Sequence, residues 1–486
     1  MKIDFIYEPE LEFGTDRHID IRFGLMNYGP FDFDSELAPK QINLGLVGTP
    51  ETIGGVEEWL DRCQDGLPAK ESNQPNLFPR FPGYGEDSNL RAAVVTDSRL
   101  QQTISPDEIA TLCKGRCTDQ TIEAAVNIFI RELERLDEKP TVQVLMCAVP
   151  MNLLEFMDQE EMPEVGADDD EDSDEEGATN YGIDFHHLLK ARAMKLKKPT
   201  QIILPMTYDN AKRRQQKRDA SKPRRLQDEA TRAWNLYTAL YYKAGGIPWR
   251  LVRDSKQPSV CYIGVSFYKT LDGSKMMTST AQIFNERGEG VILRGGVADL
   301  SADDKQPHLQ GSDAFALLGK SLDAYRGEHY NFPARVVIHK TSSYTSDEID
   351  GFKQALKHHQ IDFADFINIR RSYTRLLRDG EYPTLRGTLL SLESRSHILY
   401  TRGGVDFFKT YPGMYVPRPL EFFCHETQQT PRFLAQEMLG LTKMNWNNTQ
   451  FDNADPIIVK AARRVGAVLK YVDEDGFVQS RYAYYM

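Results

Sequence analysis

The sequence predicts an α/β protein with two large domains. Its 486 residues exceed what one ordinary hydrophobic core organises, since domains of roughly 100 to 200 residues are typical. The first half alternates short apolar runs with helical stretches, as in a parallel sheet with crossover helices. The second half opens with three closely spaced strands before helices and strands alternate again. These observations indicate two α/β domains of different topology.

The first half contains three predicted strands. They are residues 91–96 (RAAVVT), 142–149 (VQVLMCAV) and 201–205 (QIILP). A long helix is predicted from Ser105 to Asp137, and a second one from residue 226 to residue 244, where a glycine pair ends it. This order of elements predicts a Rossmann-like domain.

The second half begins with a predicted antiparallel meander. Further helices and strands follow, so that the predicted elements are strands at 260–267, 277–284 and 290–295, a helix at 311–325, a strand at 334–339, and helices at 346–359 and 456–469. A meander followed by alternating helices and strands is the order expected of an RNase H-like domain. We therefore expect an N-terminal extension over residues 1–90, the Rossmann-like domain over 91–247 and the RNase H-like domain over 248–486.

Composition indicates a soluble, globular protein. The chain is 40% hydrophobic and 27% charged, and no run approaches the roughly 18 to 20 apolar residues of a membrane span. The start of the chain, MKIDFIY, lacks the apolar region of a secretory signal, so a cytoplasmic location without a membrane is expected. Six scattered cysteines favour reduced thiols over disulfides, with Cys113 and Cys117 as an alternative pair of metal ligands.

The net charge of −12 is concentrated in one segment. Residues 158–176, within a predicted acidic loop at 158–177, contain twelve acids and neither lysine nor arginine. The rest of the chain therefore carries no net charge, and its local fields matter more than its total. The acidic run is either a tolerated loop insertion or a mimic of nucleic acid that shields a basic groove.

A basic segment follows the third predicted strand. Residues 211–225 contain eight lysines or arginines, at the carboxyl end of a strand where open α/β sheets form ligand crevices. The segment is either a solvated loop or a phosphate-binding surface. Tyr208, Lys212, Gln227 and Lys243 resemble the pocket of the Argonaute MID domain, in which a tyrosine stacks on the first guide base while lysines and a glutamine hold the 5′ phosphate.

Further segments extend this resemblance along the chain. Residues 23–31 (FGLMNYGPF) resemble the entry to the MID region of prokaryotic Argonautes. Too few residues precede the predicted strand at 91–96 for the N-terminal and PAZ domains of long members. Residues 371–377 (RSYTRLL) resemble a segment of the PIWI domain in which arginines approach the nucleic-acid backbone, here Arg371 and Arg375. The resemblance is therefore to short prokaryotic Argonautes, which consist of MID and PIWI domains.

The acidic residues of the PIWI nuclease site are missing. RNase H-type cleavage uses carboxylates that hold two divalent ions roughly 3.5 to 4 Å apart. At the positions that match those ligands, this chain has Ser266, Thr341 and, in the closing helix, Arg463. Two neutral groups and a cation cannot neutralise two divalent metals. The resemblance thus implies an inactive PIWI domain, and Asp347 or Asp350 would be the ligands if the protein were instead an endonuclease.

The same resemblance implies one Mg²⁺ ion and several partners. The carboxylate of Met486 would help bind the ion at the guide 5′ phosphate, unless the end of the chain is frayed. The expected partners are a guide RNA, a single-stranded DNA target and an APAZ-domain effector subunit. That effector would be a sirtuin-like NAD hydrolase, with a TIR protein or a nuclease as alternatives, and activation could raise the oligomeric state. Besides the inactive guide-binding protein and the endonuclease, a third hypothesis is a structural subunit that binds no guide.

Overall fold

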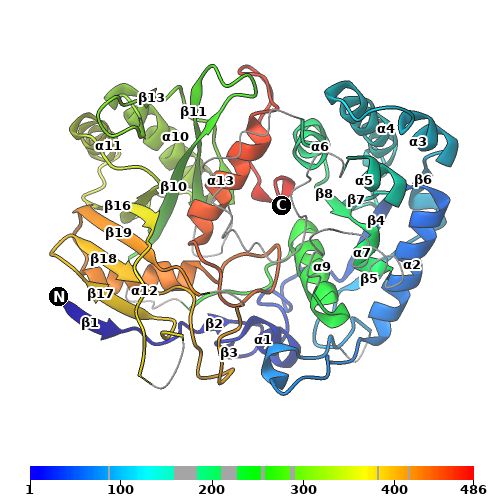
Figure 1. Ribbon diagram of the computed structural model, residues 1–486, viewed down its shortest axis with the longest axis horizontal. Helices are drawn as coiled ribbons and strands as arrows, with labels where there is room; N and C mark the ends of the chain where they lie inside the picture. The colour runs from blue at the N-terminus through cyan, green and yellow to red at the C-terminus, as the bar shows by residue number, and fades with distance from the viewer. Residues whose placement is uncertain are drawn as a thin grey trace. The chain divides into compact units, whose positions relative to one another are not determined.

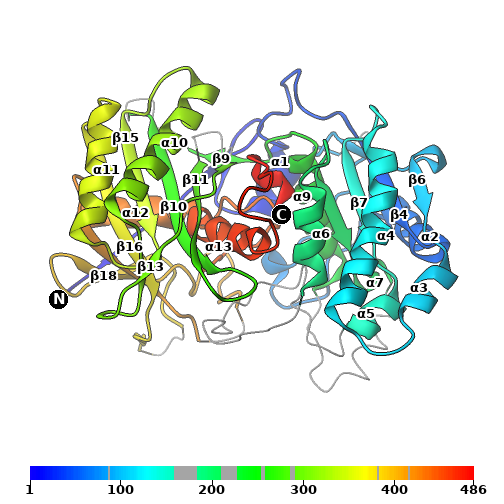
Figure 2. The ribbon, with the colours of Figure 1, turned by 90° about the horizontal axis from the view of Figure 1, so that it is seen from above.

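The computed structural model describes residues 1–85, 88–157, 183–209, 227–252, 258–284, 290–379, 383–413 and 416–486, with residues 279–284 described by their backbone alone. The chain divides into two compact units (Figures 1 and 2). A five-stranded unit contains Leu25–Pro248, Trp446–Thr449 and Met486, and a nine-stranded unit contains Met1–Gly24, Trp249–Asn445 and Gln450–Tyr485. No helix in the described ranges is long and apolar enough to cross a membrane.

The five-stranded unit is built on a parallel sheet. Its strands are β4 (Gln41–Gly48), β5 (Ala93–Val95), β6 (Gln101–Thr103), β7 (Val144–Ala148) and β8 (Thr200–Ile203). The strand order is β5-β4-β7-β8, with β6 also paired to β4, and every pair is parallel. All five residues of β7 are buried, as expected for a central strand covered on both faces.

Helices cover both faces of this sheet. They are α2 (Pro50–Asp65), α3 (Pro106–Leu112), α4 (Asp119–Asp137), α5 (Met151–Met157), α6 (Phe185–Ala193), α7 (Pro205–Tyr208) and α9 (Glu229–Lys243), with short 3-10 turns η1 (Pro75–Leu77) and η2 (Ser98–Leu100). Helices α4 and α6 pack together, and they lie across the sheet from α2 (Figure 2). Helix α1 (Ile21–Tyr28) spans the boundary between the two units.

Two predictions about this unit are wrong. The predicted start of the domain at residue 91 misses β4, which pairs with three other strands, so residues 25–90 belong to the sheet rather than to an extension. The predicted helix from Ser105 to Asp137 is two helices, because Gly115 adopts a left-handed φ of 112° that ends the first one. The chain then starts α4 with a capping box at Thr118.

The nine-stranded unit has a mixed sheet. Its order is β1-β17-β18-β19-β16-β15-β10-β11-β12, and only β10, β15 and β16 pair in parallel. The strands are β1 (Lys2–Phe5), β10 (Val260–Lys269), β11 (Met276–Phe284), β12 (Gly290–Ile292), β15 (Arg335–Lys340), β16 (Phe363–Arg371), β17 (Thr388–Ser391), β18 (Ser396–Leu399) and β19 (Leu420–Glu426). The predicted meander is β10-β11-β12, and the N-terminal β1 joins the same sheet through β17.

Helices α10 (Gly311–His329) and α11 (Ser346–His358) cover one face of this sheet, and α13 (Ile457–Leu469) covers the other (Figure 2). Helix α13 approaches β10 closely, since a Cβ atom on Gly264 would lie 2.1 Å from the carbonyl oxygen of Ile458. The remaining elements are α12 (Pro431–Leu441), η4 (Tyr482–Tyr484), and two small sheets made of β2 (Leu11–Glu12), β3 (Arg17–His18) and β9 (Arg250–Leu251), and of β13 (Asp299–Leu300) and β14 (Pro307–His308).

Candidate functional site

Ser266 and Thr341 lie side by side at the carboxyl ends of two parallel strands. Strands β10 and β15 pair through Val265 and Lys340, and the N–H of Thr341 donates to the carbonyl oxygen of Val265 over 3.1 Å. Val265 belongs to the core beneath α10 and α11. Strand alternation therefore turns Ser266 to the opposite face, which α13 covers. Two residues 75 positions apart in the sequence thus share one edge of the sheet.

The third position, Arg463, is held by a carboxylate that sequence reasoning missed. Its guanidinium Nη1 forms an ion pair with Oδ2 of Asp455, which precedes α13 and has an exposed fraction of 2%. Arg371 also approaches this oxygen, with its Nη2 atom 3.7 Å away. Burial raises the pKa of Asp455, but the positive charges of Arg463 and Arg371, with those of Lys460 and Arg402, lower it further than burial raises it. Asp455 is therefore an ionised, cation-neutralised residue.

Arg371 and Arg463 contact the same carboxylate, although the sequence analysis gave them unrelated roles. Arg371 was expected to approach the nucleic-acid backbone, and Arg463 was expected at the position of a metal ligand, yet both contact Asp455. Arg375 follows in the loop after β16, where its Nη1 atom donates to the carbonyl oxygens of Ser372 and Thr374, each over 3.1 Å. The only sequence signal for Asp455 was its place immediately before Pro456 and the closing helix.

Acids near the strand ends have structural partners. Glu348 caps α11 together with Thr345, and its Oε1 atom lies 2.6 Å from Nζ of the fully buried Lys340. Asp347 accepts a hydrogen bond from the N–H of Gly311 over 2.5 Å, at the start of α10. Burial lowers the pKa of Lys340, and Glu348 offsets part of that effect. Glu348 and Asp347 therefore act at the starts of α11 and α10.

At the opposite end of the central strands, Arg335 neutralises the buried Asp365 and the partly buried Glu437. Arg335 donates from Nε to Asp365 over 2.7 Å and binds both carboxylate oxygens of Glu437, at 2.7 and 2.9 Å. Burial lowers the pKa of Arg335, but the two carboxylates raise it above its ordinary value. This network therefore has the bidentate geometry of a structural ion pair.

In the five-stranded unit, Lys243 and Met486 are in direct contact. The Nζ atom of Lys243 donates to the main-chain oxygen of Met486 over 3.1 Å and to Oε1 of Gln201 over 2.5 Å. Lys243 and Met486 have exposed fractions of 2% and 5%. Gln201, on β8, was missed because its run was considered only as an apolar strand. The buried ammonium group of Lys243 therefore has two oxygen acceptors, one from β8 and one from Met486.

The other expected phosphate ligands are placed differently. Tyr208 ends α7 with an exposed fraction of 5%, and its ring packs so closely on α2 that a Cβ atom on Gly55 would lie 2.7 Å from Cε2. Its hydroxyl oxygen is buried without a hydrogen-bond partner. Gln227 accepts a hydrogen bond from Asn235 over 2.7 Å. Lys212 and the rest of the basic segment, like the acidic run at 158–176, lie outside the described residues.

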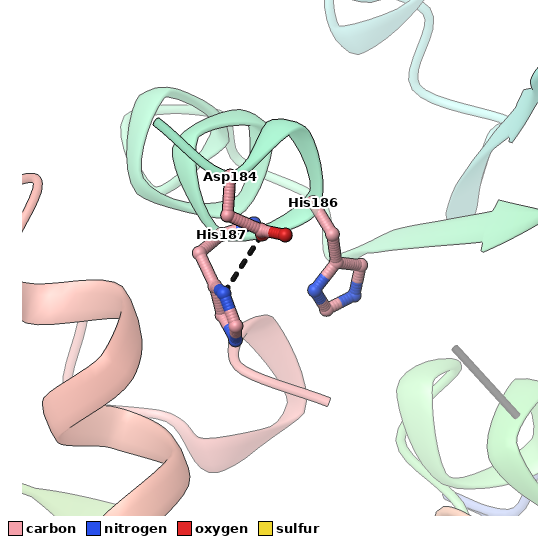
Figure 3. A group of neighbouring side chains, drawn as sticks. All are labelled: Asp184, His186 and His187. Atoms are coloured by element: carbon pink, nitrogen blue, oxygen red, sulfur yellow. Dashed lines mark hydrogen bonds and ion pairs between the residues drawn. The ribbon is translucent and has the colours of Figure 1, made fainter. Parts of the chain in front are cut away.

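A cluster of one aspartate and two histidines lies at the start of α6, and the sequence analysis did not predict it. Asp184, His186 and His187 each offer a ligand atom, and these atoms lie within 4.8 Å of one another (Figure 3). The signal was the local pattern Asp-x-His-His, which combines a carboxylate with two imidazoles. Within the part of the chain that the structure describes, the six cysteines form no disulfide.

Comparison with known proteins gives the class of fold. No family model matches the chain, and no curated protein matches its sequence. The structure resembles Clostridium butyricum Argonaute bound to a guide DNA and a 19-mer target DNA, with a TM-score of 0.65, 14% identity, and coverage of 98% of this chain and 54% of that one. A. aeolicus Argonaute with externally bound siRNA gives a TM-score of 0.61 at 13% identity, with 99% and 56% coverage.

Marinitoga piezophila Argonaute in complex with a 5′-hydroxyl guide RNA is a third neighbour, with a TM-score of 0.54, 11% identity and coverage of 100% and 59%. The chain therefore has an Argonaute-like fold, and it spans little more than half the length of these proteins. The predicted α/β fold class, with a Rossmann-like and an RNase H-like part, is confirmed.

Proposed function

We propose that this protein is a short prokaryotic Argonaute that binds a guide and its target without cutting either strand. The observation that carries the proposal is the pair Ser266 and Thr341, which lie side by side and which the resemblance assigns to the metal-ligand positions of active members. Neither side chain is anionic. The cation Arg463, on the helix over the same face, is bound to Asp455, which precedes that helix. These residues do not fit a pair of divalent ions, so no cleavage step is assigned to them.

The guide's 5′ phosphate would bind near Lys243. The buried ammonium group, with Gln201 and Met486 beside it, supports this assignment, and Lys212, Tyr208 and Gln227 complete the proposed pocket. The main-chain oxygen of Met486 and Oε1 of Gln201 are hard oxygen donors, which fit Mg²⁺. That ion would neutralise phosphate charge in the pocket. Stacking by Tyr208 requires its ring to leave its buried position against α2.

The guide would be RNA and the target single-stranded DNA. Base pairing then supplies the sequence specificity, and the protein need recognise only the backbone and shape of the duplex. Arg371 and Arg375, at and after the end of β16, are the proposed backbone contacts. Binding through such cations would weaken as salt concentration rises.

The output would come from a second protein. We infer an APAZ-domain partner in a heterodimer, carrying a sirtuin-like NAD hydrolase in preference to a TIR domain or a nuclease. Target capture would activate this effector, with a possible increase in oligomeric state, and would deplete NAD during invasion by phage or plasmid. This chain itself would lie in the cytoplasm and have no catalytic residues. The protein that copurifies with it tests this part of the proposal.

Two other functions remain as competitors. An endonuclease using Asp347 or Asp350 is disfavoured by the hydrogen bond that already engages Asp347 with Gly311. A subunit that binds no guide is the second competitor, and it is disfavoured because Lys243, which the resemblance assigns to the guide phosphate, lies buried beside Gln201 and Met486.

Binding of RNA with a 5′ phosphate or a 5′ hydroxyl tests the pocket. We expect wild type to prefer the phosphate, and Lys243→Met to lose about tenfold or more of that preference while keeping affinity for the 5′-hydroxyl strand. Lys195→Ala removes an exposed lysine of the same unit and is the matched control. Equal preference in wild type and Lys243→Met would exclude the proposed site.

A further inference from the structure

A second metal site is indicated at the N-terminus of α6, on residues that were not assigned to guide or target. Asp184 caps this helix, and its Oδ1 atom accepts a hydrogen bond from the N–H of His187 over 2.7 Å. The cap fixes the backbone of the first turn and brings the side chains of residues 184, 186 and 187 together. The carboxylate lies between the two imidazole rings, which project to the same side (Figure 3).

The distances within this cluster suit a metal ion. Nδ1 of His187 lies 2.8 Å from Oδ1 of Asp184, and the centroids of the two imidazole rings are 5.2 Å apart. One ligand atom from each residue lies within 4.8 Å of the others. Ligands of a tetrahedral zinc ion are separated by roughly 3.3 Å, given bonds of about 2.0 to 2.1 Å. Small side-chain rotations are therefore sufficient to bring the three atoms onto one ion.

Nδ1 of His187 is buried, and its neighbour is the carboxylate of Asp184. An imidazole nitrogen and a carboxylate oxygen that face each other in this way are both suitable ligands for one metal ion. The side chains of His187 and Asp184 have exposed fractions of 22% and 13%, so an ion can still enter.

The chemistry of the ligands selects the metal. Burial raises the pKa of Asp184, but contacts with His187 and His186 lower it further, so that the carboxylate is ionised at neutral pH. Imidazoles are neutral ligands near pH 7.5 and suit zinc and related transition metals, whereas Mg²⁺ prefers oxygen. Two imidazoles and one carboxylate also leave a coordination position for water, as in open zinc sites.

We propose that Asp184, His186 and His187 bind one Zn²⁺ ion and stabilise the first turn of α6. Its ligand set differs from that of the Mg²⁺ site proposed at Met486, because two of its three ligands are imidazole nitrogens and none of them is Met486, Lys243 or Gln201. Neither guide nor target is needed to form it. The proposal therefore stands or falls independently of the proposed function.

The test is a zinc titration of the metal-stripped full chain against a chromophoric chelator, at pH 7.5 and without nucleic acid. We expect wild type to bind one more equivalent of zinc than His186→Ala plus His187→Ala. The matched control is His358→Ala plus His359→Ala, which removes the adjacent histidine pair at the C-terminal end of α11. That variant should bind zinc as wild type does.

Two further variants separate metal binding from folding. Asp184→Asn keeps a good helix cap but removes the anionic ligand, so its melting temperature without metal should match wild type while zinc affinity falls about tenfold or more. Cys113→Ser plus Cys117→Ser should retain the site. Unchanged zinc stoichiometry and affinity in the double-histidine variant and in Asp184→Asn, or loss of the ion in the cysteine variant, would overturn the proposal.

Discussion

The N–H of Thr341 donates a hydrogen bond to the carbonyl oxygen of Val265, which fixes Ser266 and Thr341 next to each other across two parallel strands. Active nucleases of this fold class require acids that converge on metal ions. In this chain the two neighbouring side chains are hydroxyls, which carry no charge to hold such ions.

Aspartates placed at positions 266 and 341 should make the stability of the protein depend on divalent metal. Ser266→Asp plus Thr341→Asp places carboxylates at a site where Ser266 has an exposed fraction of 3%, so the variant should lose about 3 kcal/mol or more of unfolding free energy without metal. Mg²⁺ or Mn²⁺ should raise the melting temperature of the variant and leave that of wild type unchanged. An equal response to metal in both proteins would show that wild type already has a metal site there.

Removing the shared carboxylate should weaken the nine-stranded unit. Asp455→Asn leaves Arg371 and Arg463 without their common anionic partner, and breaking such a buried contact costs about 3–5 kcal/mol. Urea unfolding measures the loss. Asp303→Asn, at an exposed position of the same unit, should change stability by less than about 0.5 kcal/mol. Similar stability of both variants would contradict the assigned role of Asp455.

Buried His339 should make the protein less stable in acid. Burial, with the charge of Arg335, lowers the pKa of His339 to about 3, whereas an unfolded histidine has a pKa of about 6.5. Its neutral form therefore contributes stability above pH 6.5, and this is lost as pH falls, because the unfolded chain binds the proton first. The loss should reach about 2 kcal/mol between pH 6.5 and pH 5.

Urea unfolding at the two pH values checks this expectation. His339→Gln should be less sensitive to pH over that interval than wild type, while His358→Gln, which changes an exposed histidine, should not differ from it. The same pH dependence in His339→Gln and wild type would contradict the assignment.

Extending the chain beyond Met486 tests the proposed cation at the guide phosphate. Met486 is buried and bonded to Lys243 through its main-chain oxygen, so a short glycine–serine tail should displace it and change that oxygen's charge. We expect the extended protein to lose the Mg²⁺-dependent part of its affinity for 5′-phosphorylated RNA. A tail at the N-terminus is the control. Undiminished Mg²⁺ dependence would remove Met486 from the pocket.

The sequence predicted the fold well where apolar periodicity was strong. Strands β7, β10 and β15 and helices α9 and α13 start and end within about three residues of their predicted bounds. Strand β4 was missed although its sequence, QINLGLVG, is apolar, because the segment before residue 91 was assigned to an N-terminal extension. The break at Gly115 was missed because the helical periodicity resumes in α4.

Site residues were predictable only where a local motif marks them. The expectations at Ser266, Thr341 and Lys243 came from the resemblance of the surrounding segments to Argonautes. Asp455 and Gln201 did not, since their importance comes from contacts with Arg463 and Lys243 that bring distant segments together. Tyr208 is the opposite case, in which a residue was predicted for a role that its surroundings do not suit. Its sequence position suits base stacking, but packing against Gly55 buries the ring. Tertiary contacts of this kind leave no periodic signal.

The most direct test of the central claim is an assay of binding and cleavage on the same guide-loaded protein. With a 5′-phosphorylated guide RNA, a complementary single-stranded DNA and Mg²⁺ or Mn²⁺, wild type should bind the target in a sequence-dependent manner and leave it intact. Cleavage of the target at a position fixed by the guide, abolished by Asp347→Ala or Asp350→Ala, would contradict the account.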